Sequence, residues 1–68
     1  RRSGESDPLY DKAVDLVLRE RRATISFVQR HLGVGYNRAA NLLEAMEEAR
    51  IVSKANSMGR REILVPEN

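Results

Sequence analysis

Four side chains with hydrogen-bonding head groups lie close together in the middle of the chain: Asn37, Arg38, Asn41 and Glu44. Asn37, Asn41 and Glu44 follow helical spacing, so a helix would place them on one face. Arginine can bind O6 and N7 of guanine, asparagine can pair with N6 and N7 of adenine, and glutamate can accept from N4 of cytosine. This combination predicts a helix that reads base edges in the major groove of double-stranded DNA, although many polar helix faces are only solvated.

Basic side chains flank this stretch on both sides. The net charge is only +2, and ten of the twelve cations are arginine, which suits phosphates as well as guanine. Residues 5–15 carry four acids and one lysine, whereas residues 19–38 carry five arginines and one glutamate. Three cations surround Gly59, in a loop suited to phosphates or to the minor groove. Besides the four residues above, the expected DNA-binding set contains Arg21, Arg22, Arg30, Tyr36, Lys54, Arg60 and Arg61.

Other kinds of site have little support in the sequence. The chain has no cysteine, which excludes disulfides, zinc–thiolate sites and thiol nucleophiles. His31 is the only histidine and has no second ligand at metal-binding spacing, so no metal is expected. Glu47 and Glu48 are adjacent and diverge on a helix, so they do not form an acid–base pair. A chain of 68 residues also builds too small a core for a deep pocket, so we expect a binding module without a cofactor or catalytic residues.

The first part of the chain carries the signals of a linker and a helix. Residues 1–6 have no apolar member and are expected to form a disordered lead. Asp7 and Pro8 predict a helix start, as N-cap and first helical residue, and apolar spacing continues the helix to about Glu20. Residues 23–25 are short and β-branched, which predicts an extended strand.

Two further helices are predicted in the middle of the chain. Ser26 and Gln29 have the spacing of a capping box and predict the start of a short helix. Gly33 is suited to end it. A longer helix is expected over residues 36–50, and it carries the polar face described above.

The last part of the chain predicts a hairpin. Residues 51–52 and 61–65 are extended segments joined by a polar loop over residues 53–59. A short helix, a turn and a longer helix followed by a hairpin predict a winged helix-turn-helix. We therefore expect an α+β domain over residues 7–66, with three helices, a small antiparallel sheet and one wing, followed by a tail over residues 67–68.

Six segments carry a more specific pattern: Asp7-Pro-Leu-Tyr-Asp, Arg21-Arg-Ala-Thr-Ile-Ser, Val28-Gln-Arg, Val34-Gly-Tyr-Asn-Arg-Ala-Ala, Glu44-Ala-Met-Glu and Gly59-Arg-Arg-Glu-Ile-Leu. They resemble the C-terminal gamma domain of the FtsK/SpoIIIE family of bacterial DNA translocases. The resemblance runs from about Asp7 to Val65. Since the chain opens at Arg1 without a methionine, we expect it to be a piece of a longer protein.

The resemblance implies a parent protein with an ATP-driven ring-shaped motor, anchored in the bacterial inner membrane at the division site. The gamma domain would lie in the cytoplasm without touching the membrane. It would read short, polar, G-rich chromosomal motifs and so orient the motor during chromosome segregation. Its implied partners are double-stranded DNA, neighbouring gamma domains on that DNA and a Xer-type tyrosine recombinase.

The resemblance also implies roles for particular residues. The family's base readers correspond to Asn37 and Glu44, and its wing arginine corresponds to Arg61. A third reader, usually arginine, is Asn41 in this chain. Because asparagine favours adenine where arginine favours guanine, the target motif is left open.

Two other functions are compatible with the same residues. A winged-helix transcription regulator would normally need its own dimerisation element, and the sequence shows none. A protein-docking module would use the long helix or the acidic first helix to bind a recombinase, with little DNA specificity. Salt separates DNA binding from docking, because binding to phosphates weakens steeply as salt rises.

Overall fold

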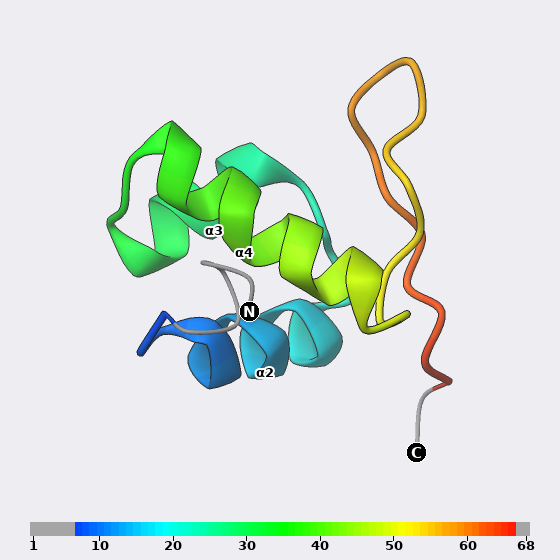
Figure 1. Cartoon of the computed structure of the whole chain (residues 1–68), viewed down its shortest axis with the longest axis horizontal. Helices are drawn as coiled ribbons and strands as arrows, with labels where there is room; N and C mark the ends of the chain where they lie inside the picture. The colour runs from blue at the N-terminus through cyan, green and yellow to red at the C-terminus, as the bar shows by residue number, and fades with distance from the viewer. Residues whose placement is uncertain (1–6, 67–68) are drawn as a thin grey trace.

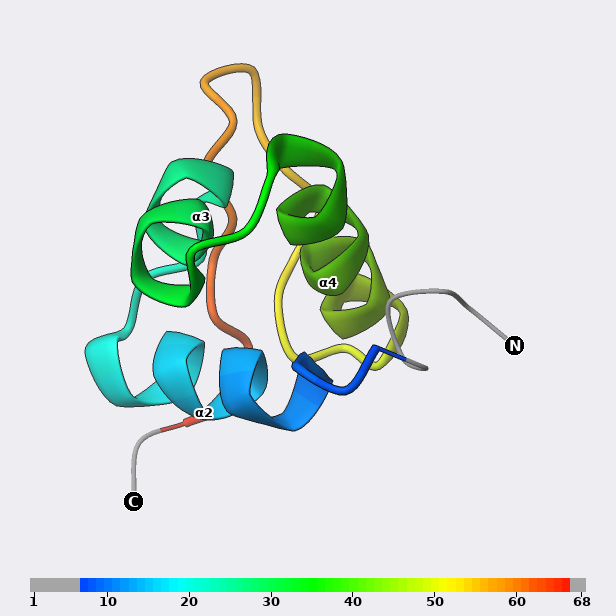
Figure 2. The ribbon, with the colours of Figure 1, turned by 90° about the vertical axis from the view of Figure 1, so that its left-hand side faces the viewer.

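The computed structural model describes residues 7–66, so the predicted lead and tail lie outside the described residues. Within this range it contains three helices, α2 (Tyr10–Glu20), α3 (Ile25–Leu32) and α4 (Tyr36–Glu48). The N-terminal ends of α3 and α4 lie at the end of the molecule away from α2, and the loop that follows α4 projects at the same end (Figures 1 and 2). The predicted order of three helices followed by a projecting loop is confirmed.

Helix α2 is preceded by a turn centred on Pro8. Oδ1 of Asp7 accepts from the backbone N–H of Leu9 at 2.9 Å, and the carbonyl of Asp7 accepts from the N–H of Tyr10 at 2.9 Å. The helix therefore begins at Tyr10, two residues later than predicted. It ends at Glu20, and its C-cap Arg21 has the left-handed conformation with φ 56°.

Helix α3 begins with a different cap from the one predicted. Thr24 is extended, and its Oγ1 accepts from the N–H of Phe27 at 3.3 Å. Ser26 already lies in the helix, so its assignment as N-cap was wrong, and so was the strand over residues 23–25. A β-branched threonine suits either an extended segment or an N-cap, and here it caps. The predicted end is confirmed, because Gly33 has φ 67° and its N–H donates to the carbonyl of Gln29.

Helix α4 begins at Tyr36, as predicted, but ends at Glu48 rather than residue 50. Gly35, which precedes it, is extended and supplies no side-chain cap. Arg50 has φ 63°, and its N–H donates to the carbonyl of Glu47 at 3.0 Å. A left-handed residue reverses the chain direction, so the chain turns here toward the projecting loop.

Residues 51–64 form this loop, which we call the wing. Its two arms are antiparallel: the N–H of Ser53 donates to the carbonyl of Glu62 at 2.8 Å, and the N–H of Leu64 donates to that of Ile51 at 2.9 Å. Between these bonds lies one isolated antiparallel bridge, which joins Val52 and Ile63.

The prediction of an α+β fold with an antiparallel sheet was wrong, because residues 7–66 contain no strand beyond this single bridge. In a regular antiparallel ladder, Ser53 and Glu62 would exchange two backbone hydrogen bonds, and so would Ile51 and Leu64; each pair makes only one. The N–H of Glu62 donates to the hydroxyl of Ser53 instead of its carbonyl, and the N–H of Ile51 donates to the carbonyl of Met46 at the end of α4. The expected third strand is absent as well, since Ile25 already belongs to α3. The domain is helical and winged-helix-like.

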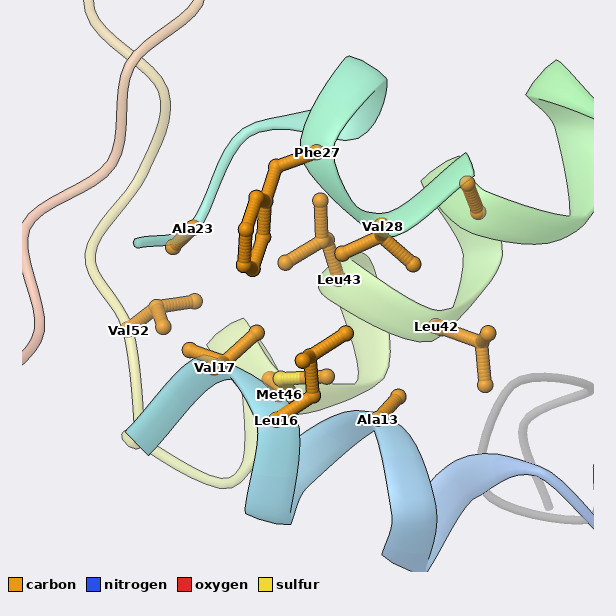
Figure 3. Close-up of a cluster of buried hydrophobic side chains, with 11 residues drawn as sticks. Ala13, Leu16, Val17, Ala23, Phe27, Val28, Leu42, Leu43, Met46 and Val52 are labelled. Atoms are coloured by element: carbon orange, nitrogen blue, oxygen red, sulfur yellow. The ribbon is translucent and has the colours of Figure 1, made fainter. Parts of the chain in front are cut away.

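The hydrophobic core lies where the three helices meet (Figure 3). No polar or charged residue among those described is buried, so packing of apolar side chains holds the helices together. Val52 reaches this core from the base of the wing. The fully buried larger side chains are Leu42, Leu43, Met46, Val17, Val28 and Val52.

Candidate nucleic-acid interface

Helix α4 presents one buried face and one exposed polar face. Leu42 and Leu43 are buried, whereas Asn37, Asn41 and Glu44 are exposed. Within residues 7–66, no hydrogen bond or ion pair is recorded for the side chains of these three polar residues. Their head groups are therefore available to an external partner. Tyr36, in the first turn of the same helix, is 61% exposed.

Arg38 lies on the same helix but is engaged by its own chain. Its Nε and Nη2 donate to the two carboxylate oxygens of Asp7, each at 2.7 Å. This bond, followed by the one from the N–H of Leu9, lowers the pKa of Asp7 to about 2, and the carboxylate raises the pKa of Arg38. Arg38 thus differs from Asn37, Asn41 and Glu44 in having a partner within the chain, although its side chain remains partly exposed.

The arginines before and on α3 have different surroundings. Nη2 of Arg21 donates to the carbonyl of Val65 at 2.9 Å, which ties the end of α2 to the chain after the wing. Arg22 is exposed, with its Cζ 5.8 Å from the ring centroid of Phe27. Arg30 is exposed on α3. His31, also exposed, has its ring 4.4 Å from that of Phe27.

The wing places its three cations differently. Lys54 and Arg60 are exposed near the tip. Arg61 is turned inward: its side chain is 9% exposed, and its Nη1 donates to Oε1 of Glu47 at 2.6 Å and to the carbonyl of Ser53 at 3.1 Å. Of the two arginines predicted to contact DNA from the wing tip, only Arg60 points to solvent in this structure.

Sequence reasoning missed three residues that shape this surface: Asp7 and Glu47, which hold arginines, and Asn56. Oδ1 of Asn56 accepts from the N–H groups of Met58 and Arg60, at 2.9 and 3.0 Å, and so forms the tip of the wing. Asparagine three residues before a glycine is a local turn signal that could have shown this. The partners of the arginines are 14 and 31 residues away, and no local pattern indicates them.

A pocket of about 680 Å³ lies between the connection from α2 to α3 and the wing tip. Residues 21–26 form one wall and residues 58–61 the other. Four arginines line it. Arg21 and Arg61 bond to the protein and brace the walls, whereas Arg22 and Arg60 are exposed. Two segments far apart in the sequence thus form one basic surface.

Two other kinds of site can be assessed in the described part of the chain. No group of three or more histidine, cysteine, aspartate or glutamate side chains in residues 7–66 could hold a metal ion. None of the helices in this range is long and apolar enough to cross a membrane.

Comparison with known proteins places the chain in a family. The model of the FtsK gamma domain matches residues 4–66. The chain is 66% identical over 64 residues to the DNA translocase FtsK 2 of Ralstonia nicotianae, and 60% and 56% identical over 62 residues to the DNA translocases FtsK of Pseudomonas syringae pv. tomato and Brucella melitensis. These matches cover 94%, 91% and 91% of this chain but only 8% of each relative. The chain therefore belongs to the FtsK gamma domain family.

Proposed function

We propose that this domain binds double-stranded DNA in a sequence-specific manner, with α4 in the major groove. The observation that carries the proposal is the exposed face of α4, where Asn37, Asn41 and Glu44 have no recorded partner in the described residues. These side chains can pair with adenine through asparagine and with cytosine through glutamate. They lie on a helix fixed by a buried core, so their spacing is set before DNA arrives.

We propose that a separate surface of the domain contacts the DNA backbone. Arg22 and Arg60 line the basic pocket, which has room for a sugar–phosphate segment, and Lys54 on the wing and Arg30 on α3 are further exposed cations outside its lining. Contacts with phosphates position a protein on the duplex, and bases specify the sequence. The N-terminal ends of α3 and α4 and the tip of the wing lie at the same end of the molecule, so one duplex can reach them together (Figures 1 and 2).

The relatives extend the proposal to a parent protein, because they are named DNA translocases. We propose that this domain reads short, polar, G-rich chromosomal motifs and orients the motor of such a translocase in chromosome segregation. The motor would lie elsewhere in a parent at the inner membrane of the division site, with this domain in the cytoplasm. Contacts with neighbouring gamma domains and with a Xer-type recombinase belong to the same proposal.

Selection on random duplex DNA tests the central claim. The 68-residue chain should enrich one short motif, and a titration should show tighter binding to a duplex with that motif than to a scrambled duplex of the same composition. Binding should also weaken steeply as salt rises, through release of counterions. A chain that enriches no motif and shifts no duplex at low salt would refute DNA recognition and favour a docking module.

A further inference from the structure

Arg61 joins the wing to the helix that carries the proposed base readers. Its partner Glu47 lies on α4 three residues after Glu44. The two atoms Nη1 and Oε1 are 2.6 Å apart, and the side chain of Arg61 is 9% exposed. The second bond of the guanidinium, to the carbonyl of Ser53, crosses the wing from one arm to the other. One side chain thus contacts both arms and α4.

Few other contacts hold the wing. Val52 packs in the core, and Ile51 and Ile63 pack against it, but all three lie at the base. Beyond them, the bonds of Asn56 and Ser53 stay within the wing. Of the polar contacts recorded between wing and helices in residues 7–66, the pair formed by Arg61 and Glu47 is the nearest to the tip.

We propose that the ion pair of Glu47 and Arg61 fixes the wing tip relative to α4 and so sets which phosphates Arg60 and Lys54 reach when α4 reads its bases. Both members of the pair are positioning residues. The proposal rests on the proposed DNA-binding function. It differs from a direct contact of Arg61 with DNA, the role implied by the family resemblance.

The two roles predict opposite effects of removing the carboxylate at position 47. If Arg61 contacted DNA, Glu47→Gln would release it and remove a negative charge, so binding to every duplex would strengthen. If the pair positions the wing, Glu47→Gln lets the tip move, and the preference for the selected motif over a scrambled duplex falls by about 2- to 150-fold, the range of coupling between contacting residues.

Glu62→Gln is the matched control. Glu62 is an exposed carboxylate on the wing, and no partner of its side chain is recorded. Its loss changes the net charge as Glu47→Gln does, so affinity for both duplexes should rise slightly and their ratio should stay unchanged. If Glu47→Gln behaves like this control, the proposal is overturned.

A charge swap tests the pair itself. Arg61→Glu alone should abolish most of the motif preference, and the combination of Glu47→Arg with Arg61→Glu should restore at least half of it. A direct phosphate contact cannot recover with a glutamate at position 61. Circular dichroism and the thermal midpoint are measured for each variant, because a purely structural pair would change the midpoint without changing the ratio. A folded swap variant without recovery contradicts the proposal.

The position of the wing can also be measured without DNA. The chain contains no cysteine, so Ser57→Cys at the wing tip and Lys12→Cys on α2 provide two specific sites for nitroxide labels. The distribution of distances between the labels, measured by electron paramagnetic resonance, should broaden with Glu47→Gln and stay unchanged with Glu62→Gln. An unchanged distribution of distances in the Glu47 variant refutes the proposal that the ion pair fixes the wing tip. Since this test contains no DNA, its outcome is independent of whether the chain recognises a motif.

Discussion

Helix α4 and the wing are the two parts of the molecule expected to meet DNA, and they are held in opposite ways. The buried face of α4 packs in the apolar core, which leaves its polar groups available. The base of the wing packs on the same core through Val52, but beyond the base the wing is held by its own polar groups: Ser53, Asn56 and Arg61 bond within it or to α4. An element fixed by apolar packing can offer its polar side chains to a ligand, whereas one fixed by polar bonds must use some of them for itself.

The largest expected effect tests how each part is held. Leu43 on α4 is fully buried, so Leu43→Ala should lower the free energy of unfolding by about 2–5 kcal/mol through the lost contacts and the cavity left behind. Leu64 on the wing is 52% exposed, and Leu64→Ala should cost far less. Urea denaturation measures both. Equal losses would mean that Leu64 contributes as much to the packing of the domain as Leu43 does.

The polar groups of α4 are expected to affect binding without affecting folding. Asn37→Ala and Glu44→Ala should each weaken binding to the selected motif by about 1–3 kcal/mol, the usual value of a good base contact. Their thermal midpoints should match that of the parent chain, because both side chains are exposed and without a recorded partner in the described residues. If both variants bind the motif normally, the exposed face of α4 does not read bases.

Asn41→Arg tests whether residue 41 reads a base, as proposed. Arginine can bridge O6 and N7 of guanine, so the variant should gain about 1 kcal/mol on G-rich motifs. Part of the gain comes from the added charge, appears on all duplexes and disappears at high salt. Duplexes varied one base at a time separate the two parts. A uniform gain with no altered base position would show that residue 41 does not read a base.

The two neighbouring arginines of the wing should now behave differently. Arg60→Ala should reduce the slope of log affinity against log salt by about one unit for the lost phosphate contact. Arg61→Ala should lower the thermal midpoint, since it removes an ion pair whose guanidinium is largely covered. Titrations at several salt concentrations and a thermal melt measure these effects. A loss of slope in the Arg61 variant that equals the loss in the Arg60 variant, without a change in midpoint, would contradict the inward role.

The smallest effect concerns Arg38, the arginine of α4 that bonds to its own chain. Asp7 has its pKa lowered from 3.8 to about 2, first by the bond from Arg38. A depressed pKa means that the unfolded chain takes up the proton more readily, so this bond stabilises the domain above pH 3.8 and is lost as pH falls toward 2. The loss of stability between these values should be smaller in Asp7→Asn than in the parent chain, as measured by urea denaturation at each pH. Identical profiles of unfolding free energy against pH for the two chains would contradict a stabilising bond between Asp7 and Arg38.

The sequence could predict what local patterns determine. Glycine readily adopts the left-handed conformation that ends a helix, so Gly33 marks the end of α3. The spacing of Asn37, Asn41 and Glu44 defines a helix face without knowledge of the fold. It could not predict where Arg38 and Arg61 point, because a guanidinium binds a carboxylate as readily as a phosphate and the acids lie far away in the chain. The absence of the sheet also comes from a choice between acceptors that the sequence pattern does not show. The hydroxyl of Ser53 and the carbonyl of Met46 accept the hydrogen bonds that a ladder would need.

The side chains that shape the wing also limit how it can be exchanged between proteins. A wing built on a regular ladder carries its architecture in its backbone and could be grafted onto another scaffold as a cassette. This wing would take Ser53 and Asn56 with it but leave the acidic partner of Arg61 behind on α4. A graft onto a helix without a carboxylate at the corresponding position would bring a largely covered guanidinium with no counter-ion, which is costly. The transplantable unit is therefore the wing together with the last turn of α4.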